Sequence, residues 1–288
     1  MATSPASSSS YPALTYSDAL TLASRGHALA AVDARLLLQH VTGATIAQIV
    51  SYPGRQLGPI DRMRFESLVA RRAAGEPIAY LLGEREFYSR PFVVTPAVLI
   101  PRPETEGLVD AALARLPVDC MAGLVDLGTG SGCVGITLAL ERPQSRVLAI
   151  DASVDAIGVA RRNATALQCA NIDFVIGDWL QGIDGHRLAM IVGNPPYISA
   201  DDAHLGQGDL RFEPRAALTP GDDALSAVRE IILQAPAALA AGGWLILEHG
   251  HEQGPIVRQL LAGSGFTDVF SDRDLAGHER ITGGRLPD

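Results

Sequence analysis

The segment Asp126-Leu127-Gly128-Thr129-Gly130-Ser131-Gly132 ends a short apolar run and decides the fold of the chain. Its glycines let the backbone turn tightly and come close to a ligand. A helical pattern begins just after it, over residues 134–140. In an open α/β sheet, ligands bind beyond the carboxyl ends of the strands, where such turns lie. The segment therefore predicts a strand, a turn and a helix that together face a ligand.

The same alternation of apolar runs and helical patterns continues to the end of the chain. The predicted strands are residues 124–127, 147–150, 172–176, 188–192, 244–248, 266–270 and 280–282. Helical patterns fall between most of them, over residues 134–140, 153–167, 224–239 and 256–262. Such alternation predicts an α/β fold with a doubly wound, mostly parallel sheet. A chain of 288 residues is long for one domain and comfortable for two.

The part of the chain before this alternation predicts a small helical domain, residues 13–83. The predicted helices are residues 17–24, 33–41, a short segment after Thr45, and residues 61–74. Ser17-Asp18 and Thr45 are suited to cap helices, and Gly43 is suited to end one. Such a domain can stabilise its neighbour or provide a surface that grips a partner, and the pattern does not separate these roles.

Three further segments complete the predicted organisation. Residues 1–12 contain a run of four serines and neither a basic nor an apolar signal region, so we expect a disordered tail. Residues 84–105 predict a β-hairpin linker. Residues 106–288 form the α/β domain.

Composition limits the classes of function. The net charge is −9 and every basic residue is arginine, so a generic polyanion binder is disfavoured. The three cysteines have no CxxC spacing and are expected to be reduced, in a cytoplasmic protein. No apolar run approaches the roughly 18 residues of a membrane span, so no membrane association is expected.

A second acidic residue points to the kind of ligand. Asp151 ends the second predicted strand, where a carboxylate binds ribose hydroxyls, so the pocket suits an adenosine-containing cofactor. A dinucleotide and S-adenosylmethionine both fit this pattern. Asp126 would repel a pyrophosphate but suits the ammonium of a methionine group. Asp178 can accept from an adenine amino group, and Trp179 can stack on the purine or pack in the core.

The tetrapeptide Asn194-Pro195-Pro196-Tyr197 follows the fourth predicted strand. Two prolines remove backbone donors and stiffen the chain, so carbonyl oxygens are left pointing outward. An amide and an aromatic ring bracket this turn. The arrangement suits a flat group that carries an NH2, although Asn-Pro and Pro-Pro are also common in ordinary turns.

Taken together, these motifs resemble the class I S-adenosylmethionine-dependent methyltransferases, which have a Rossmann-like seven-stranded sheet with an antiparallel last strand. More narrowly, the chain resembles the PrmC/HemK family, which methylates a glutamine side-chain nitrogen (N5) in the Gly-Gly-Gln motif of peptide chain release factors. Further segments carry this resemblance: residues 33–38, 77–83, 87–88, 99–106, 213–218 and 248–253.

The resemblance implies roles for individual residues. The residues implied to bind S-adenosylmethionine are Gly128, Thr129, Gly130, Ser131, Gly132, Asp151, Trp179 and Asn194. Substrate glutamine would be bound by Asn194, Pro195, Pro196 and Tyr197, with Asn194 and Pro195 as the catalytic pair. The Asn194 side-chain oxygen and the Pro195 carbonyl would each accept one N–H of the glutamine amide, and Tyr197 would pack on its plane. The helical domain would recognise the release factor.

Other interpretations remain open. A glutamine methyltransferase acting on a ribosomal protein, or an adenine-N6 nucleic-acid methyltransferase, would use the same tetrapeptide. The negative net charge of the chain disfavours the nucleic-acid methyltransferase, and no direct nucleic-acid binding is expected. A nicotinamide-dependent oxidoreductase leaves the double-proline turn unexplained, and a non-enzymatic binding module would be expected to carry damaged motifs. His249 and His251 favour a structural turn over a metal site, and we expect no metal and a monomer.

Overall fold

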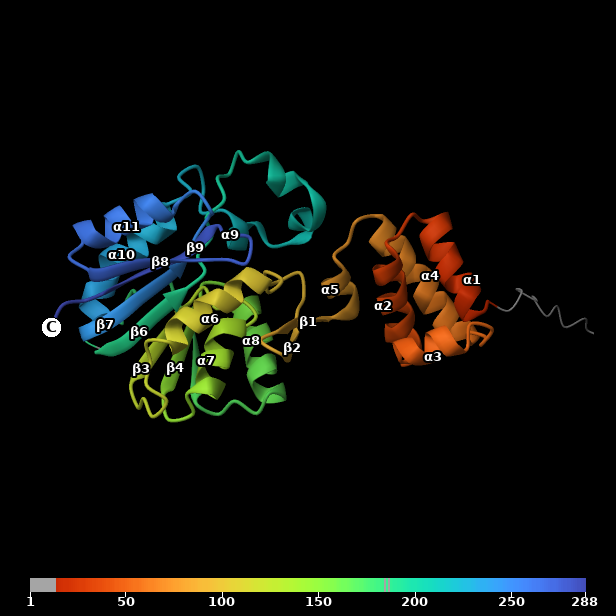
Figure 1. Ribbon diagram of the computed structural model, residues 1–288, viewed down its shortest axis with the longest axis horizontal. Helices are drawn as coiled ribbons and strands as arrows, with labels where there is room; N and C mark the ends of the chain where they lie inside the picture. Colours follow the sequence, from red (N-terminus) through yellow and green to blue (C-terminus); the bar gives the residue numbers. More distant parts are fainter. Residues whose placement is uncertain (1–13, 184, 186) are drawn as a thin grey trace, which may run out of the picture. The chain divides into compact units, whose positions relative to one another are not determined.

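The computed structural model describes residues 14–183, 185 and 187–288. The predicted disordered tail, residues 1–12, lies outside the described residues. The chain divides into two compact units with the boundary between Leu82 and Gly83 (Figure 1). We call them the helical unit, up to Leu82, and the sheet unit, from Gly83 to Asp288.

The helical unit contains the predicted helices and one more. Its elements are α1 (Tyr16–Thr21), a π-helical turn (Leu22–Gly26), α2 (Ala31–Thr42), α3 (Ile46–Ser51), α4 (Pro59–Ala73) and α5 (Ile78–Leu82). Helices α2 and α4 pack together through the fully buried side chains of Leu37, Leu38, Phe65 and Val69. These residues are spaced by one helical turn or by one residue, as expected for the apolar face of an amphipathic helix.

Two of the three predicted helix boundaries are confirmed. Gly43 ends α2 with a φ of +65°, and Thr45 caps α3 in a reciprocal pair with Gln48. The predicted cap of α1 was wrong, because Thr15 occupies the cap position and Ser17 lies inside the helix. Thr15 and Asp18 exchange side-chain and backbone hydrogen bonds, so the signal was a capping box that begins two residues earlier.

The predicted hairpin is present and belongs to the sheet unit. Strands β1 (Glu84–Phe87) and β2 (Arg90–Val93) pair antiparallel around Tyr88 and Ser89, which both have positive φ. Asn163, in α8 (Val154–Ala166), accepts from the Val93 N–H at 2.7 Å and donates to the Val93 carbonyl at 3.0 Å. This side chain takes the place of a neighbouring strand for β2.

The core of the sheet unit is a seven-stranded sheet, and each of the predicted strands is confirmed. The strands are β3 (Gly123–Leu127), β4 (Arg146–Asp151), β5 (Ile172–Ile176), β6 (Leu188–Gly193), β7 (Leu239–Glu248), β8 (Thr267–Arg273) and β9 (Glu279–Arg285). Their spatial order is β5-β4-β3-β6-β7-β9-β8, and β9 runs antiparallel to both of its neighbours. Strand order reverses at β3, so a switch point lies between β3 and β6.

Helices cover both faces of this sheet (Figure 1). One core contains side chains of α6 (Glu106–Leu113) and α7 (Cys133–Glu141), and the other contains side chains of α10 (Ser226–Ala238) and α11 (Gly254–Gly263). Successive residues of a central strand face opposite cores, as Leu124 and Val125 do in β3. The carboxyl ends of the parallel strands stay uncovered by these helices and carry the motifs identified in the sequence.

Candidate functional site

A cavity of about 360 Å³ lies at the carboxyl ends of β3, β4, β5 and β6. This volume is in the range of small-molecule binding sites, roughly 300–1,000 Å³. Residues that follow these four strands form its base, namely Gly128, Asp151, Gly177, Asp178, Trp179, Asn194 and Pro196. The structure thus brings five of the predicted site residues, from distant parts of the sequence, to one cavity.

The opposite wall of the cavity comes from two loops. Ala97 and Leu99 follow the hairpin, and Pro214, Ala216 and Ala217 lie at the start of α9 (Arg215–Leu218). The buried carboxylate of Glu213 holds these loops together, because it accepts from the Ile100 N–H and from the Arg102 guanidinium. The sequence analysis assigned no role to Glu213 or to this apolar wall.

Gly128 is the exposed residue of the glycine turn. It has a φ of +66°, which residues with a side chain rarely adopt. A Cβ atom at this position would lie 3.6 Å from the ring of Trp179 and 4.0 Å from the backbone oxygen of Asn194. The missing side chain therefore keeps open the space between the turns that follow β3, β5 and β6.

The other residues of the glycine turn face the protein interior. Thr129 and Ser131 are 5% and 2% exposed and are not part of the cavity lining. Thr129 donates to Asp126 Oδ2 at 2.6 Å, and the Gly135 N–H donates to the same oxygen at 2.9 Å. Burial raises the pKa of Asp126 to about 7. Asp126 Oδ2 therefore fastens the turn to α7. Asp126 is not among the residues that line the cavity, and its suitability for an ammonium group remains a prediction.

Gly130 and Gly132 also shape the turn. The Gly130 N–H donates to Asp151 Oδ2 at 2.9 Å. Gly132 caps α7 with a φ of +83°, and a Cβ atom there would lie 2.7 Å from Ile136 of the same helix and 3.2 Å from Ala160 of α8, so this glycine allows α7 to begin close to α8. Cofactor contacts by Thr129, Gly130, Ser131 and Gly132 remain predictions.

Asp151 lines the cavity at the end of β4. Its Oδ1 accepts from the Ser153 N–H at 2.8 Å, and its Oδ2 accepts from Gly130. Burial raises the pKa of Asp151, and these two hydrogen bonds oppose the shift. Each carboxylate oxygen keeps a second lone pair, so Asp151 can also accept hydrogen bonds from ligand hydroxyl groups.

Trp179 packs its half-buried ring against the apolar core under β6 and β7 and also borders the cavity, and its stacking on a purine remains a prediction. Its φ is +48°, a left-handed conformation that costs a residue with a side chain roughly 1–2 kcal/mol. Beside it, exposed Asp178 also lines the cavity and accepts from Gln181 at 2.8 Å.

The Asn194-Pro195-Pro196-Tyr197 turn leaves β6 at this same edge. Asn194 and Pro196 line the cavity, whereas Pro195 is buried. No donor among the described residues hydrogen-bonds to the Pro195 carbonyl oxygen. Tyr197 is not part of the cavity lining, and its predicted packing on a substrate amide remains a prediction.

A buried acid holds the Tyr197 end of this turn. Glu248, the last residue of β7, is 1% exposed and accepts from the Tyr197 hydroxyl at 3.3 Å. The Asn194 amide nitrogen donates to the Thr105 hydroxyl at 3.3 Å, and Thr105 in turn stabilises the charged form of Glu248. Burial outweighs these hydrogen bonds and raises the pKa of Glu248 to about 7. The sequence analysis missed Thr105 and Glu248 as site residues, although an acid ending an apolar strand is a usable signal.

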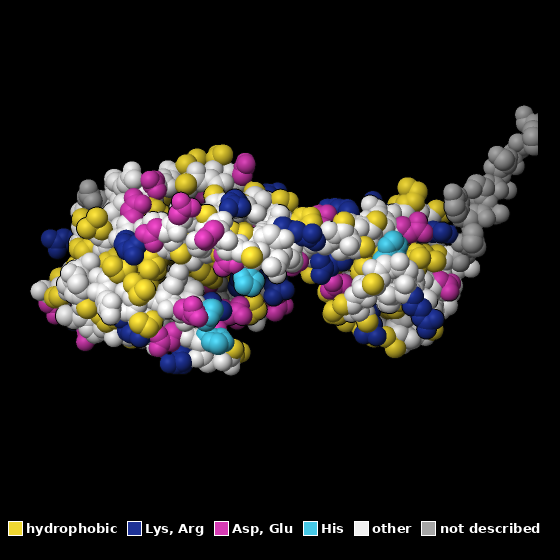
Figure 2. Space-filling model, turned by 90° about the horizontal axis from the view of Figure 1, so that it is seen from above, with side chains coloured by type: hydrophobic (Ala, Val, Ile, Leu, Met, Phe, Trp, Pro, Cys, Tyr) yellow, Lys and Arg dark blue, Asp and Glu magenta, His cyan; other side chains and the backbone are white. Residues whose placement is uncertain are grey.

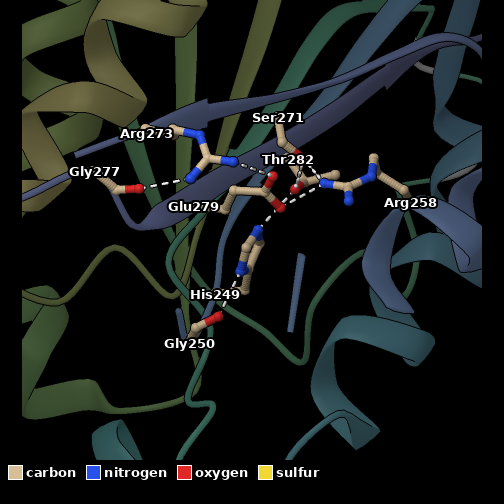
Figure 3. A network of polar contacts seen from close by, with 8 residues as sticks. All are labelled: His249, Gly250, Arg258, Ser271, Arg273, Gly277, Glu279 and Thr282. Atoms are coloured by element: carbon tan, nitrogen blue, oxygen red, sulfur yellow. Dashed lines mark hydrogen bonds and ion pairs between the residues drawn. The ribbon is translucent and has the colours of Figure 1, made fainter. Parts of the chain in front are cut away.

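His249, the residue after Glu248, belongs to a separate polar network (Figure 3). Its Nδ1 lies 2.8 Å from the Gly250 carbonyl, which can only accept, so Nδ1 carries the proton. Ser271 accepts from Arg258 and shares a hydrogen bond with the Thr282 hydroxyl, which also lies 2.7 Å from His249 Nε2. Burial lowers the pKa of His249, which favours the neutral imidazole, and its Nε2 then accepts from Thr282. The network ties the end of β7 to β8, β9 and α11.

Two further observations concern metals and membranes. No cluster of three or more metal-ligating side chains occurs among the residues that the structure describes. Within the described ranges, no helix has both the length and the apolar character needed to cross a bilayer.

The charges on the surface are mixed. On the face of the sheet unit seen in Figure 2, acidic and basic side chains alternate and do not gather into one broad basic patch.

Comparison with known proteins gives matches over both units. Residues 19–83 match the PrmC N-terminal domain, and residues 109–209 match the methyltransferase small domain. A 16S rRNA N2 G1207 methyltransferase of T. thermophilus, solved with AdoMet and guanosine, is 16% identical with a TM-score of 0.53. The match covers 70% of this chain and 49% of that one, and at this identity it shows a shared fold.

Curated relatives are much closer in sequence. A release factor glutamine methyltransferase of Burkholderia pseudomallei is 49% identical over 269 residues, which cover 91% of this chain and 94% of the relative. The release factor glutamine methyltransferase of Escherichia coli is 47% identical over 253 residues, 88% of this chain and 91% of the relative. The chain therefore belongs to the release factor glutamine methyltransferase family.

Proposed function

We propose that this protein transfers a methyl group from S-adenosylmethionine to the side-chain nitrogen (N5) of the glutamine in the Gly-Gly-Gln motif of peptide chain release factors. One observation carries the proposal: Asn194 and Pro196 of the stiff turn after β6 line the cavity, and neither Asn194 Oδ1 nor the Pro195 carbonyl accepts a hydrogen bond from a described residue. Two acceptors at a fixed spacing suit the two N–H groups of a primary carboxamide. The relatives described above are named release factor glutamine methyltransferases, which supports methylation of a glutamine in a release factor.

The residues of the cavity fit S-adenosylmethionine. Asp151 has free lone pairs for the ribose hydroxyls, and Asp178 can accept from the adenine amino group. The apolar side chains of Leu99, Ile150 and Trp179 offer surfaces for the purine ring. When bound, S-adenosylmethionine supplies an electrophilic methyl group.

The turn has to make an amide nitrogen reactive, because the lone pair of that nitrogen is delocalised into the carbonyl. Hydrogen bonds from both amide hydrogens to Asn194 Oδ1 and the Pro195 carbonyl draw the nitrogen toward a pyramidal geometry and localise its lone pair. They also stabilise the positive charge that builds on the nitrogen. Fixed alignment of this kind lowers the activation free energy of a reaction by up to roughly 7–11 kcal/mol. The nitrogen loses one proton, which passes to solvent.

Recognition of the whole release factor requires a surface larger than this cavity. We propose that the helical unit supplies it, while a loop that bears the glutamine enters beside Asn194. The substrate belongs to the translation apparatus, which places the proposed reaction in the cytoplasm. We further propose that the protein works as a monomer.

Mass spectrometry of the substrate tests the function. The protein and S-adenosylmethionine are incubated in parallel with a release factor, ribosomal proteins, or adenine-containing DNA. We expect one added methyl group on the glutamine of the release-factor peptide, and none on the other two substrates. Methylation of a ribosomal protein or of DNA instead would overturn the assignment.

A single substitution tests the proposed catalytic group. Asn194→Ala should reduce turnover of the release factor by about 100-fold or more, the loss seen for removal of one fixed transition-state hydrogen-bonding group. The fold should be retained, as measured by the urea unfolding curve. Near-normal turnover by a folded Asn194→Ala protein would exclude the mechanism.

A further inference from the structure

We propose that Glu248 is a positioning residue that acts through the Thr105 hydroxyl to hold the side-chain oxygen of Asn194 toward the cavity. The inference rests on the proposed function of Asn194 as an acceptor for the substrate amide. It adds two residues to the site that never contact the substrate themselves. These residues come from the linker and from the end of β7, far from Asn194 in the sequence.

The fold brings Glu248 and Thr105 to the same side of the sheet. In β7, Glu248 follows Ile246 by two residues, so both face the core that contains α6. Thr105 directly precedes α6 and is 3% exposed. His249 is the next residue and faces the opposite side, where it joins the separate network of Figure 3.

The direction of each hydrogen bond follows from the chemistry of the acid. An ionised carboxylate only accepts hydrogen bonds. Glu248 Oε2 is buried and has no hydrogen-bond partner among the described residues, and the Thr105 hydroxyl lowers the pKa of Glu248. In the proposed arrangement this hydroxyl donates to the carboxylate. A hydroxyl that donates to Glu248 has only lone pairs to offer to Asn194. The Asn194 amide must therefore turn its NH2 toward Thr105, as observed at 3.3 Å.

The direction of the Asn194 NH2 group also determines the direction of the amide oxygen, Oδ1. The oxygen and nitrogen of a planar carboxamide point in different directions, so Oδ1 turns away from Thr105. No residue in the described part of the chain donates a hydrogen bond to Asn194 Oδ1, and Asn194 lines the cavity. Without the Thr105 hydroxyl, the amide would be free to rotate about its last torsion angle, which has two broad minima. The rotated form would present an NH2 to the NH2 of the substrate.

Glu248 also holds the far end of the turn. The Tyr197 hydroxyl donates to Glu248 Oε1 at 3.3 Å, so one buried carboxylate restrains both residues that bracket the two prolines. The backbone of the segment is held separately, because Ile198 donates to the Leu218 carbonyl at 3.0 Å. A loss of Glu248 should therefore loosen side chains more than backbone.

Nuclear magnetic resonance can observe the orientation of Asn194 directly. The chain contains three asparagines, so labelling asparagine with 15N at Nδ2 gives three side-chain amide signals. Asn163 and Asn171 serve as internal controls, because their amide groups donate to backbone carbonyls elsewhere in the sheet unit. Asn194→Ala identifies the third signal.

We expect one proton of the Asn194 amide to exchange slowly with water in the wild type and in Thr105→Ser, which keeps the hydroxyl. In Thr105→Val, which keeps the shape and loses the hydroxyl, this proton should exchange at least tenfold faster while the control signals stay unchanged. Glu248→Gln should give an intermediate rate, because a glutamine amide can donate to Thr105 and reverse the chain. Equal exchange rates in wild type and Thr105→Val would overturn the proposal, whatever the activity of the enzyme.

Kinetics give a second and independent test. Turnover of a release factor by the wild type tests the proposed function, and the ratios between variants test the positioning role. Thr105→Val should lower kcat by about 10- to 100-fold, as a small misplacement of a reacting group does, with the KM for S-adenosylmethionine unchanged. Thr105→Ser should stay within about threefold of the wild type.

The double variant separates positioning from general stability. If Thr105 acts through Asn194, adding Thr105→Val to Asn194→Ala should cause no further loss of kcat, because residues in one network are not additive. Two independent losses that multiply would show that Thr105 serves another purpose and would refute the inference.

Discussion

The buried carboxylate of Glu213 is paired with the guanidinium of Arg102, which lies 111 residues earlier in the chain. The Glu213 side chain is fully buried and that of Arg102 is 29% exposed. Burial raises the pKa of Glu213 despite the nearby cation and the hydrogen bond from Ile100. The pair joins the two loops that form the outer wall of the cavity, so its integrity affects both stability and ligand binding.

Removing the cation should therefore destabilise the sheet unit. Arg102→Leu leaves the Glu213 carboxylate buried without a charged partner, and breaking a buried pair in this way costs about 3–5 kcal/mol. Both tryptophans, Trp179 and Trp244, lie in the sheet unit, so fluorescence-detected urea unfolding reports on that unit alone. We expect a clearly lower midpoint in urea.

An exposed ion pair provides the control for this experiment. Arg229 pairs with Asp223, and both side chains are about half exposed, at 46% and 55%. Arg229→Leu should change the free energy of unfolding by less than about 1 kcal/mol, as exposed pairs do. If Arg102→Leu and Arg229→Leu lower the free energy of unfolding equally, the buried Arg102–Glu213 pair contributes no more to stability than an exposed ion pair.

Asp151 should determine cofactor affinity. Asp151→Ala removes the carboxylate that lines the cavity and the acceptor of the Gly130 N–H. Hydrogen bonds to a charged group are worth about 1.5–3 kcal/mol, so we expect roughly a 10- to 100-fold weaker Kd for S-adenosylmethionine by calorimetry. Asp155→Ala, an exposed position in the first turn of α8, should leave the Kd unchanged. An unchanged Kd in Asp151→Ala would remove this residue from the binding site.

The rate should depend on the ionisation of Glu248. Burial and the charge of Glu104 raise the pKa of Glu248 to about 7, and Tyr197 and Arg280 oppose this shift. The charge of Glu248 in turn raises the pKa of Cys133. A protonated Glu248 can donate to Thr105 and so reverse the hydrogen bonds that orient Asn194. We therefore expect kcat to rise between pH 6 and 8, with a midpoint near the pKa of about 7.

The pH profile needs matched variants. Glu248→Gln should abolish the rise of kcat with pH, because glutamine does not titrate. Glu252→Gln should keep it, since the Glu252 side chain is 88% exposed. A rise of the same size in Glu248→Gln would assign the titration to another group.

Asp126 should make stability fall as the pH rises. Its folded pKa of about 7 lies above the value of about 3.9 for an unfolded chain, so this contribution to stability is complete below pH 4 and is lost toward pH 7. Asparagine at this position can still accept from Thr129 and Gly135. The difference in unfolding free energy, Asp126→Asn minus wild type, should therefore rise between pH 4.5 and 7.5 in urea titrations. A constant difference would show that Asp126 is ionised at all these pH values.

The strands and helices of the sheet unit were predictable because each has a local signal. Apolar runs such as residues 172–176 are short and bounded by polar or glycine residues, and β5 has these same bounds. The beginning of β7 was missed by five residues, because Ala240, Gly242 and Gly243 have low strand propensity. The two glycines are held by Leu286, since Gly242 donates to the Leu286 carbonyl and the Leu286 N–H donates to the Gly243 carbonyl. The cap of α1 was misplaced because Ser17 and Thr15 carry equivalent local signals.

Side-chain direction within the site was less predictable. Thr129 and Ser131 follow a glycine and sit in a ligand-facing turn, yet the turn points both inward. Asp126 is 2% exposed, and its Oδ2 accepts from both Thr129 and Gly135, so this oxygen is directed into the protein. Glycines with positive φ change the direction of the backbone within this turn. The residue types alone do not predict which way the side chains between them point.

The strand–turn–helix unit around Gly128, the stiff turn after Asn194 and the succession of strands along the chain can be read from the residues alone. These are local properties, set by glycine torsion angles, proline geometry and hydrophobic periodicity. The hydrogen bond from Asn194 to Thr105, the one from Tyr197 to Glu248, and the pairing of Glu213 with Arg102 come from the folded arrangement of the chain. Contacts between residues so far apart depend on strand order and on which face of the sheet each side chain occupies, and no local pattern encodes either.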